Sequence, residues 1–499
     1  MHRQFLPSCP CLTLLIALIA LPQLTPHLQA GDAAVSDRPP NVVVFIVDDL
    51  GQRDLGCYGS TFYETPNLDR LAATGVRLTH AYSACPVCSP TRASLVTGLY
   101  PQRTGITDYI GAPQPAAWKR NTLHLPAPYA TQLALEHTTI AERLKARGYA
   151  TFFGGKWHLG GDGFLPEHQG FDLNFGGTAQ GGPYGGKKYF SPYGNPKLSD
   201  GPPGEHLPDR LASEAVRFID ANRNSPFLVW LPFYSVHTPL MARPDLEQKY
   251  KAKRSLLSQV DQFADEPPRK VRLSQDHAVY AGMVEAMDQA VGKVLSHLAE
   301  HKLDQNTLVI FTSDNGGLST SEGSPTSNQP LRAGKGWLYE GGIRTAAILR
   351  WPEHLPAAAV NSTPAISCDY VPTILDACGI PLTDNENLDG VSLLNALQPN
   401  ATPQSRPLFW HYPHYGNQGG APGAAVLLDG WKLIEWFEDG RIELFHLADD
   451  PSEQHNLATA QPEKSQHLLQ LLHAWQTDVK ALASTPNPAW DPQKPNGRR

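Results

Sequence analysis

Five short runs of apolar residues constrain the fold of this 499-residue chain more than any other feature. Each run is nearly continuous rather than alternating, which is typical of strands covered on both faces of a parallel sheet. Segments with helical patterns separate the runs, and this alternation predicts an α/β fold with a mainly parallel central sheet sandwiched by helices. The runs are NVVVFIV (41–47), YATFFG (149–154), PFLVWLPF (226–233), TLVIFTS (307–313) and AAILRW (346–351).

Four amphipathic segments supply the helices that the sheet needs. Thr65 precedes Pro66 at the start of the first segment, and Gly75 ends it, as expected of a capped helix. The second segment ends on Gly148 in the same way. The segments are 65–75, 138–148, 209–222 and 276–302. The glycine-rich stretch 176–186 and the polar stretch 241–275 are interpreted as loops or insertions.

The pattern changes near residue 385, where we place a domain boundary. Short apolar runs within 423–458 are interrupted at Asp429-Gly430 and Asp439-Gly440, and Asp-Gly between strands is a hairpin signal. A helical pattern over 465–483 follows. We therefore expect a large domain over 31–385 and a small antiparallel sheet with a helix over 386–483. Residues 484–499, rich in proline and asparagine, are expected to form a disordered tail.

The first 30 residues are typical of a secretory signal peptide. Arg3 provides the positive charge, residues 12–21 the apolar stretch, and Ala30 a cleavage position. The apolar stretch is shorter than the roughly 20 residues that span a bilayer, although an uncleaved anchor is the alternative. We expect an exported protein, periplasmic or secreted, without stable membrane association. The net charge of −7 gives no overall attraction to nucleic acid.

Polar side chains follow four of the apolar runs at the point where each predicted strand ends. In an open α/β sheet, ligands bind beyond the carboxyl ends of the strands, so these side chains are expected to meet at one edge. The side chains are Asp48 and Asp49 after 41–47, Lys156 and His158 after 149–154, His237 after 226–233, and Asp314 and Asn315 after 307–313.

The two acidic pairs at the strand ends predict a metal site. Asp48, Asp49, Asp314 and the amide of Asn315 form an all-oxygen set, which Ca²⁺ or Mg²⁺ prefers. We expect one Ca²⁺ per chain, with Mg²⁺ the less favoured ion. Zn²⁺ fits this set less well because it contains few His or Cys ligands. The alternative is that each pair forms a helix cap or a turn.

The stretch CPVCSPTRASLVTG (85–98) carries a candidate nucleophile. A zinc site would need a second Cys or His pair, and a Cys85–Cys88 disulfide is a further alternative. Ser89 can cap a helix that begins at Pro90 and ends at Gly98, which would put Cys88 at an N-terminus that favours anions. Arg92 lies one turn further on. This arrangement suits attack on an anionic ester.

These residues also carry a family resemblance. The segment CSPTRASLVTG resembles the signature of type I, formylglycine-dependent sulfatases of the arylsulfatase type, within the alkaline phosphatase superfamily. Thr91 stands where serine or alanine is common in that signature. Further segments resemble the other blocks of the family in the same order. They are FIVDDLG, GGKWHLG, VHTP, TSDNGG and GKGWLYEGGIR, which lie within residues 41–344.

The resemblance implies a sulfuric ester hydrolase with an alkaline-phosphatase-like fold and a modified Cys88. A formylglycine-generating enzyme would convert Cys88 to Cα-formylglycine, whose hydrate attacks sulfur. Residue 88 would then join Asp48, Asp49, Asp314 and Asn315 around Ca²⁺. The implied roles of the remaining residues are that Arg92 steadies the hydrate, Lys156 and Lys335 neutralise sulfate oxygens, His158 takes a proton from the hydrate, and His237 protonates the leaving oxygen. Four further cysteines would be left to pair: Cys57, Cys85, Cys368 and Cys378.

The expected substrate is a sulfated polysaccharide or a glycosaminoglycan fragment. His411, His414 and Tyr415 belong to the aromatic segment FWHYPHYG (409–416), which could line a sugar subsite or simply pack at the domain junction. Two other functions are consistent with the residues. One is a phosphodiester or phosphonate hydrolase of the same superfamily, and the other is an unmodified, non-catalytic glycan-binding protein.

Overall fold

The computed structural model describes residues 38–382, 388–402 and 405–497. The predicted signal peptide (1–30) and the domain boundary predicted at residue 385 lie outside these residues. None of the described helices is long and apolar enough to cross a bilayer.

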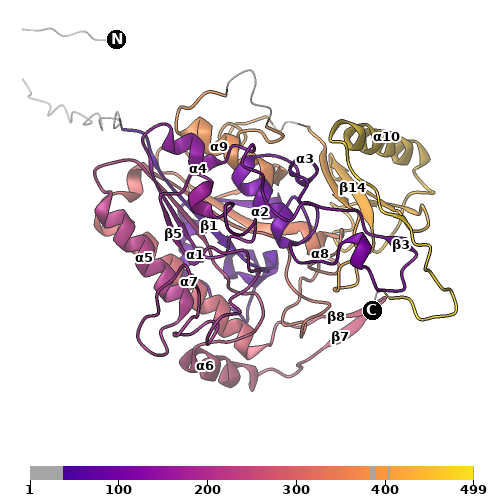
Figure 1. Cartoon of the computed structure of the whole chain (residues 1–499), viewed down its shortest axis with the longest axis horizontal. Coiled ribbons are helices and arrows are strands. Elements are labelled where there is room, and N and C mark those ends of the chain that lie inside the picture. The colour runs from indigo at the N-terminus through magenta and orange to yellow at the C-terminus, as the bar shows by residue number, and fades with distance from the viewer. Residues whose placement is uncertain (1–37, 383–387, 403–404, 498–499) are drawn as a thin grey trace, which may run out of the picture. The chain divides into compact units, whose positions relative to one another are not determined.

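The central sheet has strand order β11-β2-β10-β9-β1-β6-β4-β5, with β12 paired to β2 (Figure 1). Strands β1, β4, β5, β6 and β9 run parallel to their neighbours in this group. The carboxyl ends of β1, β4, β6 and β9 therefore meet at one edge, as the sequence predicts. The strands are β1 (Asn41–Val47), β2 (Val76–Tyr82), β4 (Ala150–Gly154), β5 (Leu173–Phe175), β6 (Phe227–Pro232), β9 (Thr307–Ser313), β10 (Arg344–Arg350), β11 (Ala359–Asn361) and β12 (Ala365–Ile366).

Helices cover both faces of this sheet, because alternate side chains of each central strand enter opposite cores. Val43 and Phe45 of β1 enter a cluster with α1 (Pro66–Ala73), α5 (Leu207–Ala221) and α7 (Ala278–Glu300). Val42 and Val44 enter the cluster on the other face. The helices on that face are α2 (Cys88–Thr97), α4 (Ile140–Lys145) and α9 (Tyr370–Ala377). This double burial explains why the strands read as continuous apolar runs.

A second, four-stranded antiparallel sheet has the order β13-β14-β15-β16 and carries α10 (Pro462–Asp478). The two Asp-Gly pairs lie between its strands as predicted, and Asp429 and Gly430 both have positive φ (51° and 78°). The sheet and α10 share one apolar core with residues of the central domain such as Tyr82 and Ile343. The strands are β13 (Leu408–Tyr412), β14 (Gly423–Leu428), β15 (Trp431–Trp436) and β16 (Ile442–His446).

Three features differ from the sequence prediction. Strand β10 runs antiparallel to β9, because the chain returns over residues 314–343 without a crossover of the kind that parallel strands need. The polar stretch 241–275 contains α6 (Pro244–Arg254) and the hairpin β7 (Phe263–Glu266) and β8 (Arg269–Arg272). The predicted disordered tail is ordered from 484 to 497, since β17 (Thr485–Pro486) pairs with β3 (His124–Leu125).

Two smaller elements complete the described fold. Helix α3 (Pro101–Thr104) follows α2, and α8 (Glu340–Ile343) precedes β10. Single turns of 3-10 helix join several of the larger elements, for example Gln52–Asp54 just beyond β1.

Candidate active site

The acidic residues that end β1 and β9 lie side by side, as the parallel pairing of Val47 with Ser313 requires. The backbone N–H of Asp49 donates to Asp314 Oδ1 (3.2 Å), and Asn315 Nδ2 donates to Asp49 Oδ1 (2.9 Å). All four residues are buried, with no more than 2% of any of them exposed. The structure thus brings together Asp48, Asp49, Asp314 and Asn315.

Three cations balance these carboxylates. Lys156 Nζ donates to Asp48 Oδ2 and Lys335 Nζ donates to Asp49 Oδ2, each at 2.7 Å. Arg92 donates through Nε to Asp314 Oδ2 (2.8 Å) and through Nη1 to the carbonyl oxygen of Lys156 (2.8 Å). All three cations are buried. The cluster is therefore charge-neutral when every member is ionised, as groups removed from water need to be.

Cys88 is the first residue of α2, and its side chain is buried beside this cluster. The N-cap residue is Val87, not Ser89 as predicted, so no side chain caps the helix. The Ser89 hydroxyl is used elsewhere, accepting from the backbone N–H of Ile110 (3.0 Å) and lying 3.1 Å from His158 Nδ1. The helix ends at Gly98 (φ 75°), as predicted. An uncapped N-terminus leaves backbone N–H groups that favour an anion.

Two histidines flank Cys88 and the carboxylates. His158 Nδ1 lies 3.4 Å from Cys88 Sγ, while its Nε2 lies 2.8 Å from the carbonyl oxygen of Ile110. His237 Nδ1 lies 2.7 Å from the carbonyl oxygen of Thr238, and its Nε2 lies 3.8 Å from Asp49 Oδ2. A carbonyl oxygen can only accept, so in the neutral rings His158 carries its proton on Nε2 and His237 carries its proton on Nδ1.

Burial and neighbouring charges shift the pKa values of this group. Burial raises the pKa of Asp48 well above its usual range, against the lowering effect of Lys156. Burial also acts to raise the pKa of Asp49, but Lys335 and His237 outweigh it and hold that pKa below the ordinary value. Burial, with Lys335, lowers the pKa of His237 to about 4. Perturbed groups gathered at one sheet edge are typical of a functional site.

Two of the site residues have a strained backbone. Asp49 and His158 adopt left-handed backbone conformations, with φ of 60° and 57°. For residues other than glycine this costs roughly 1 kcal/mol or more and persists only where the surrounding structure imposes it.

A cavity of about 320 Å³ opens above Cys88. His158, His237 and Lys335 line it together with Cys88, which agrees with the predicted site. The sequence prediction missed the other polar and aromatic lining residues: Thr238 lies in the VHTP segment but received no role, and the rest come from loops without a recognisable motif. These residues are Tyr109, Tyr184, Thr238, Glu322, Asn417 and Gln418.

The predicted sugar-binding residues His411, His414 and Tyr415 do not line this cavity. All three are buried, with at most 6% of any one exposed. His411 Nε2 lies 2.9 Å from the carbonyl oxygen of Leu482, and His414 Nε2 lies 2.9 Å from Thr107 Oγ1. The packing alternative therefore accounts for them. The cavity is instead lined by their neighbours, two and three positions beyond Tyr415.

The five described cysteines, Cys57, Cys85, Cys88, Cys368 and Cys378, are all free thiols. The structure therefore contains neither the Cys85–Cys88 disulfide nor any pairing among the other four that the sequence left open. Burial raises the pKa of Cys85 well above its usual range and also raises that of Cys88. Cys85 packs in the apolar core shared with the second sheet, whereas Cys88 faces the cavity.

The donors at the strand ends fit a hard divalent cation. Asp48 Oδ1 and Asn315 Oδ1 are buried acceptors without a hydrogen-bond donor among the described residues. Donor atoms of Asp48, Asp49 and His237 also lie within 4.8 Å of one another. Unsatisfied buried oxygens are costly, and a cation would satisfy them. With a divalent cation bound, the neutral cluster would become positive, which favours an anionic substrate.

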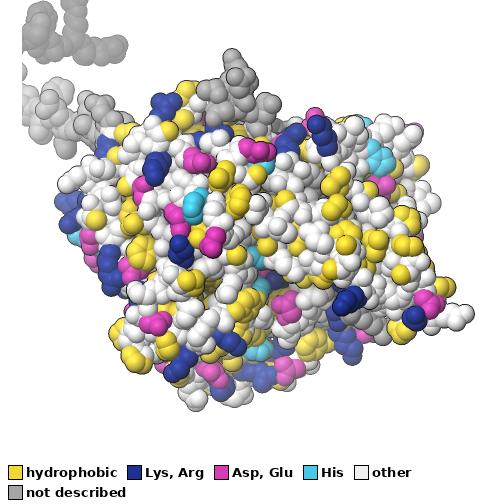
Figure 2. All heavy atoms as spheres, viewed as in Figure 1, with side chains coloured by type: hydrophobic (Ala, Val, Ile, Leu, Met, Phe, Trp, Pro, Cys, Tyr) yellow, Lys and Arg dark blue, Asp and Glu magenta, His cyan; other side chains and the backbone are white. Residues whose placement is uncertain are grey.

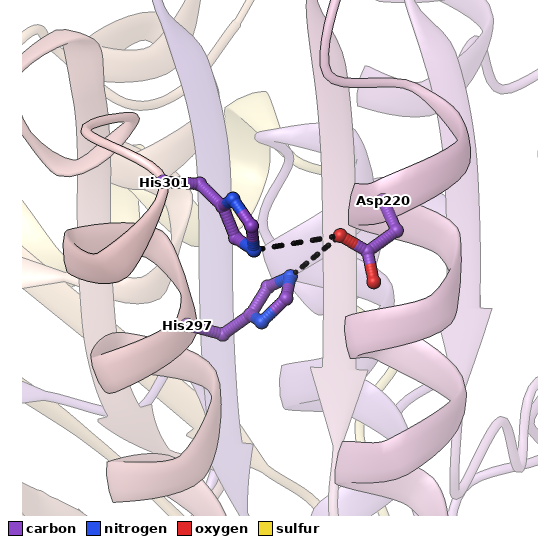
Figure 3. A group of neighbouring side chains, drawn as sticks. All are labelled: Asp220, His297 and His301. Carbon is purple, nitrogen blue, oxygen red and sulfur yellow. Dashed lines mark hydrogen bonds and ion pairs between the residues drawn. The ribbon is translucent and has the colours of Figure 1, made fainter.

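A second group with metal-ligating side chains lies on the surface, where Asp220 of α5 faces His297 of α7 and His301, the residue just after that helix (Figure 3). His297 Nε2 and His301 Nε2 lie 3.0 Å and 3.7 Å from Asp220 Oδ1. Arg223 Nη1 lies 3.0 Å from His301 Nδ1 and adds a positive charge beside the group. We therefore interpret this group as a polar contact between two helices.

Comparison with known proteins identifies the family. A family model described as Sulfatase matches residues 40–380, and a model described as N-sulphoglucosamine sulphohydrolase, C-terminal, matches residues 333–480. A sulfatase from Formosa agariphila is 32% identical, with 92% of each chain covered. Arylsulfatase A from Homo sapiens is 32% identical, with 89% of each chain covered. The crystal structure of Ps i-CgsB is 28% identical, with a TM-score of 0.73 over 91% of this chain and 95% of that one.

These matches extend over both sheets and include the strand ends that carry the charge cluster. The family model covers more than half of the chain, and both curated relatives exceed 30% identity over most of its length. The chain therefore belongs to the sulfatase family of the alkaline phosphatase superfamily and is a sulfuric ester hydrolase.

Proposed function

We propose that this protein hydrolyses sulfate esters of a sulfated polysaccharide or glycosaminoglycan sugar, with residue 88 acting as Cα-formylglycine beside one Ca²⁺. The observation that carries the proposal is the position of Cys88. It is the first residue of an uncapped helix, on the wall of a cavity and beside a buried cluster of three carboxylates and three cations. Cys88 is a free, buried thiol next to charged side chains, and apolar packing does not explain a cysteine in such a position.

Residues Asp48, Asp49, Asp314, Asn315 and residue 88 would hold the calcium ion. The ion would supply a Lewis acid at the sulfate group, and formylglycine would supply a hydrated aldehyde as nucleophile. All-oxygen ligation favours Ca²⁺ or Mg²⁺ over Zn²⁺. The chain itself fixes the carboxylates through the backbone of Asp49 and the amide of Asn315. It would require a formylglycine-generating enzyme for maturation.

The cationic side chains orient the sulfate group. Lys335 lines the cavity, and Lys156 lies at the neighbouring carboxylate Asp48. Both ammonium groups would neutralise sulfate oxygens as point charges, and a divalent cation held by Asp48 and Asp49 would add positive charge at the same site. Arg92 is fixed by three hydrogen bonds and ion pairs, so it holds its position beside residue 88 rather than following the substrate.

The two histidines move protons at opposite sides of the reacting group. His158 carries its proton on Nε2, so its Nδ1 lone pair, 3.1 Å from Ser89 Oγ and 3.4 Å from Cys88 Sγ, can accept a proton from residue 88. His237 donates through Nδ1 to the carbonyl oxygen of Thr238, which leaves Nε2 to exchange a proton with the leaving oxygen. Each imidazole is fixed by a hydrogen bond to a carbonyl oxygen, which keeps it in one tautomer.

The cavity and the relatives both favour a carbohydrate leaving group. Tyr109 and Tyr184 offer aromatic faces, and Glu322, Asn417 and Gln418 offer hydrogen-bonding groups at the same cavity. Curated relatives include N-acetylgalactosamine-6-sulfatase of Sus scrofa, 33% identical, and the Ps i-CgsB protein has been crystallised with k-i-k-neocarrahexaose. Steryl-sulfatase of Homo sapiens, at 29% identity, is also a relative, so a sterol sulfate is the contrasting substrate. We further propose that the protein is exported and acts in the periplasm or outside the cell.

The direct test combines mass spectrometry with a substrate comparison. In protein co-expressed with a formylglycine-generating enzyme, the peptide that contains residue 88 is expected to have the mass of formylglycine. 4-Nitrophenyl sulfate should be hydrolysed with a far higher kcat/KM than 4-nitrophenyl phosphate or bis(4-nitrophenyl) phosphate. Faster hydrolysis of the phosphodiester would overturn the assignment in favour of a phosphodiesterase. An unmodified thiol in native, carbohydrate-binding protein without turnover would favour the non-catalytic alternative.

The calcium site has a separate test. Asp314→Asn should lower the calcium content of purified protein, measured by atomic emission after dialysis. Glu353→Gln, a change at an exposed position, is the control and should leave calcium content unchanged. Equal calcium in Asp314→Asn and wild type would refute the ligand role of Asp314.

A further inference from the structure

The cavity above Cys88 has two chemically different sides. Cys88, Lys335 and the two histidines form the side that handles sulfate. Four other lining residues form a hydrogen-bonded group without any cation, which we name the acidic wall. The acidic wall consists of Thr238, Glu322, Asn417 and Gln418.

Glu322 is the centre of the acidic wall. Its Oε1 accepts hydrogen bonds from Asn417 Nδ2 and Gln418 Nε2, both at 2.9 Å. Its Oε2 accepts only a long bond from Thr238 Oγ1, at 3.5 Å. Thr238 lies in the loop that follows β6, and Asn417 and Gln418 lie in the loop that follows β13. Together with the loop after β9 that carries Glu322, three loops fix this carboxylate at the cavity. A carboxylate offers about four acceptor positions, and Oε2 keeps capacity for a further donor.

The backbone around Glu322 supports a ligand-binding role. Glu322, Gly323 and Ser324 have consecutive positive φ values of 54°, 92° and 41°. Glu322 and Ser324 have a Cβ atom, so the left-handed backbone conformation is energetically unfavourable for both of them. Strain of this kind persists where the surrounding structure imposes a particular side-chain placement, and it is concentrated at ligand sites.

The acidic wall has more acceptors than donors. Besides Glu322 Oε2, the amide oxygen of Gln418 is buried and has no hydrogen-bond donor among the residues that the structure describes. Gln418 itself is 3% exposed. A ligand that completes this wall must therefore bring donors, and sugar hydroxyl groups are donors. A second sulfate or a carboxylate on the same sugar would bring only acceptors and would be repelled by Glu322.

We propose that the acidic wall binds hydroxyl groups of the sugar ring that carries the scissile sulfate, and that Glu322 selects against sugars with a second anionic group beside it. This inference rests on the proposed sulfatase reaction and adds which substituents the substrate sugar carries. The cavity is bipolar, with cations at the sulfate end and a carboxylate at the sugar end. A singly sulfated, otherwise neutral sugar matches both ends at once.

The aromatic residues of the cavity fit the same ligand. Tyr184 is 54% exposed although it lines the cavity, and Tyr109 lines it too. Exposed aromatic rings beside hydrogen-bonding groups suit a pyranose ring, whose faces are apolar and whose edge carries hydroxyl groups. On the face shown in Figure 2, acidic and basic side chains are interspersed, with hydrophobic ones scattered among them.

The test compares Glu322→Gln with wild type on three kinds of substrate. The probes are 4-nitrophenyl sulfate, a panel of galactose and N-acetylhexosamine monosulfates, and the matching disulfates. On a cleaved monosulfate, kcat/KM should fall about tenfold more than on 4-nitrophenyl sulfate, since a charge-assisted hydrogen bond is lost. The kcat/KM ratio of disulfate to monosulfate should rise at least tenfold. A Glu353→Gln control, at an exposed glutamate that also has positive φ (65°), should change neither ratio.

Each other outcome contradicts a specific claim. If Glu322→Gln lowers turnover of all probes by one common factor, Glu322 only holds its loop or Lys335 in position, and the selectivity claim is wrong. If wild type cleaves 4-nitrophenyl sulfate but no monosulfate in the panel, the acidic wall does not bind such sugars, although the proposed reaction stands. If wild type with verified formylglycine cleaves no sulfate ester at all, the proposed function itself fails.

Discussion

Two of the buried clusters of opposite charges differ in how completely their polar atoms are paired. The active-site cluster joins the ends of β1 and β9 to three cations beside a cavity. The second cluster, which we name the junction cluster, lies where the second sheet meets α8 and consists of Glu340, Arg344, Lys432 and Glu453. Both contain equal numbers of acidic and basic side chains.

Every carboxylate oxygen of the junction cluster has a partner within it or nearby. Lys432 Nζ donates to Glu340 Oε1 (3.0 Å) and Glu453 Oε1 (2.8 Å), and Tyr82 donates to Glu340 Oε2 (3.0 Å). Glu453 Oε2 accepts from the backbone N–H of Glu340 (2.6 Å). The active-site cluster instead leaves buried oxygens of Asp48 and Asn315 without a hydrogen-bond donor in the described part of the chain. A network in which every polar atom is paired stabilises the fold, whereas a network with unpaired oxygens can bind a ligand that pairs with them.

The largest expected difference between the clusters is in catalysis. Cys88→Ala should lower kcat/KM for 4-nitrophenyl sulfate by at least about 10⁴-fold, because loss of a nucleophile removes the reaction path. The melting temperature should stay close to that of wild type, since only a thiol is lost. Cys85→Ala, three residues earlier and outside the cavity, is the matched control and should remain active. Wild-type turnover by Cys88→Ala would remove residue 88 from the mechanism.

Breaking the junction cluster should affect stability rather than chemistry. Lys432→Met leaves two buried glutamates without their shared cation, which should lower the free energy of unfolding by about 3–5 kcal/mol. Denaturant titration measures the loss, and activity per folded molecule should stay within about twofold of wild type. A loss below 1 kcal/mol would mean that water or protonation satisfies Glu340 and Glu453 without Lys432.

Calcium should act on one cluster only. At a calcium concentration about 100 times its Kd, the free energy of unfolding should rise by about 2.7 kcal/mol over that of the chelated protein. Thermal unfolding with EGTA and with added calcium measures this difference. The gain should persist in Lys432→Met and shrink in Asp314→Asn. A calcium effect that persists in Asp314→Asn but vanishes in Lys432→Met would place the ion at the junction cluster and contradict the proposed site.

The junction cluster should make stability depend on pH. Burial raises the pKa of Glu453 to about 7, despite the opposing effect of Lys432. The folded pKa exceeds the unfolded value, so this stabilisation is present below about pH 4.5 and is lost as pH rises through 7. Between pH 5 and 8, wild type should lose about 2 kcal/mol relative to Glu453→Gln. Parallel stability profiles for the two proteins over that range would contradict the assignment.

The smallest effect is expected at the exposed group of Asp220, His297 and His301. Asp220 and His301 are each more than 30% exposed, so water screens their interaction. Asp220→Asn should change the free energy of unfolding by less than about 1 kcal/mol. Denaturant titration of Asp220→Asn and of Lys432→Met under the same conditions compares the free energies of unfolding that the two variants lose. A loss as large as that of Lys432→Met would show that burial is not what separates strong from weak ion pairs in this protein.

Local sequence patterns predicted the parts of the molecule that are built from local rules. The strands at 41–47 and 307–313 were predicted to the residue, because continuous apolar runs have sharp ends at Asp48 and Asp314. Parallel pairing then places those ends together. His158 and His237, which follow two other strands of the sheet, accordingly line the cavity with Cys88 and Lys335.

Other predictions failed where tertiary contacts decide the outcome. Ser89 was predicted as the N-cap of α2, but Ile110 and His158 occupy its hydroxyl. His411 and His414 belong to a segment that could line a sugar subsite or pack at the domain junction, and only the tertiary structure shows that both are buried, with Nε2 atoms beside Leu482 and Thr107. The tail after 484 has the composition of a disordered segment, but backbone pairing with β3 orders it.

The sequence by itself determined the strand ends and the acidic residues that follow them, because strand burial and parallel pairing follow from residue periodicity. The motif around Cys88 and the cations Arg92 and Lys335 were indicated by the family resemblance instead. Only the tertiary structure decided that β10 runs antiparallel, that Cys88 is the first residue of its helix, and that Glu322, Asn417 and Gln418 share one wall of the cavity. The physical reason is that these loop residues lie up to 96 positions apart and carry no local pattern. Their contact depends on how the two sheets pack against each other.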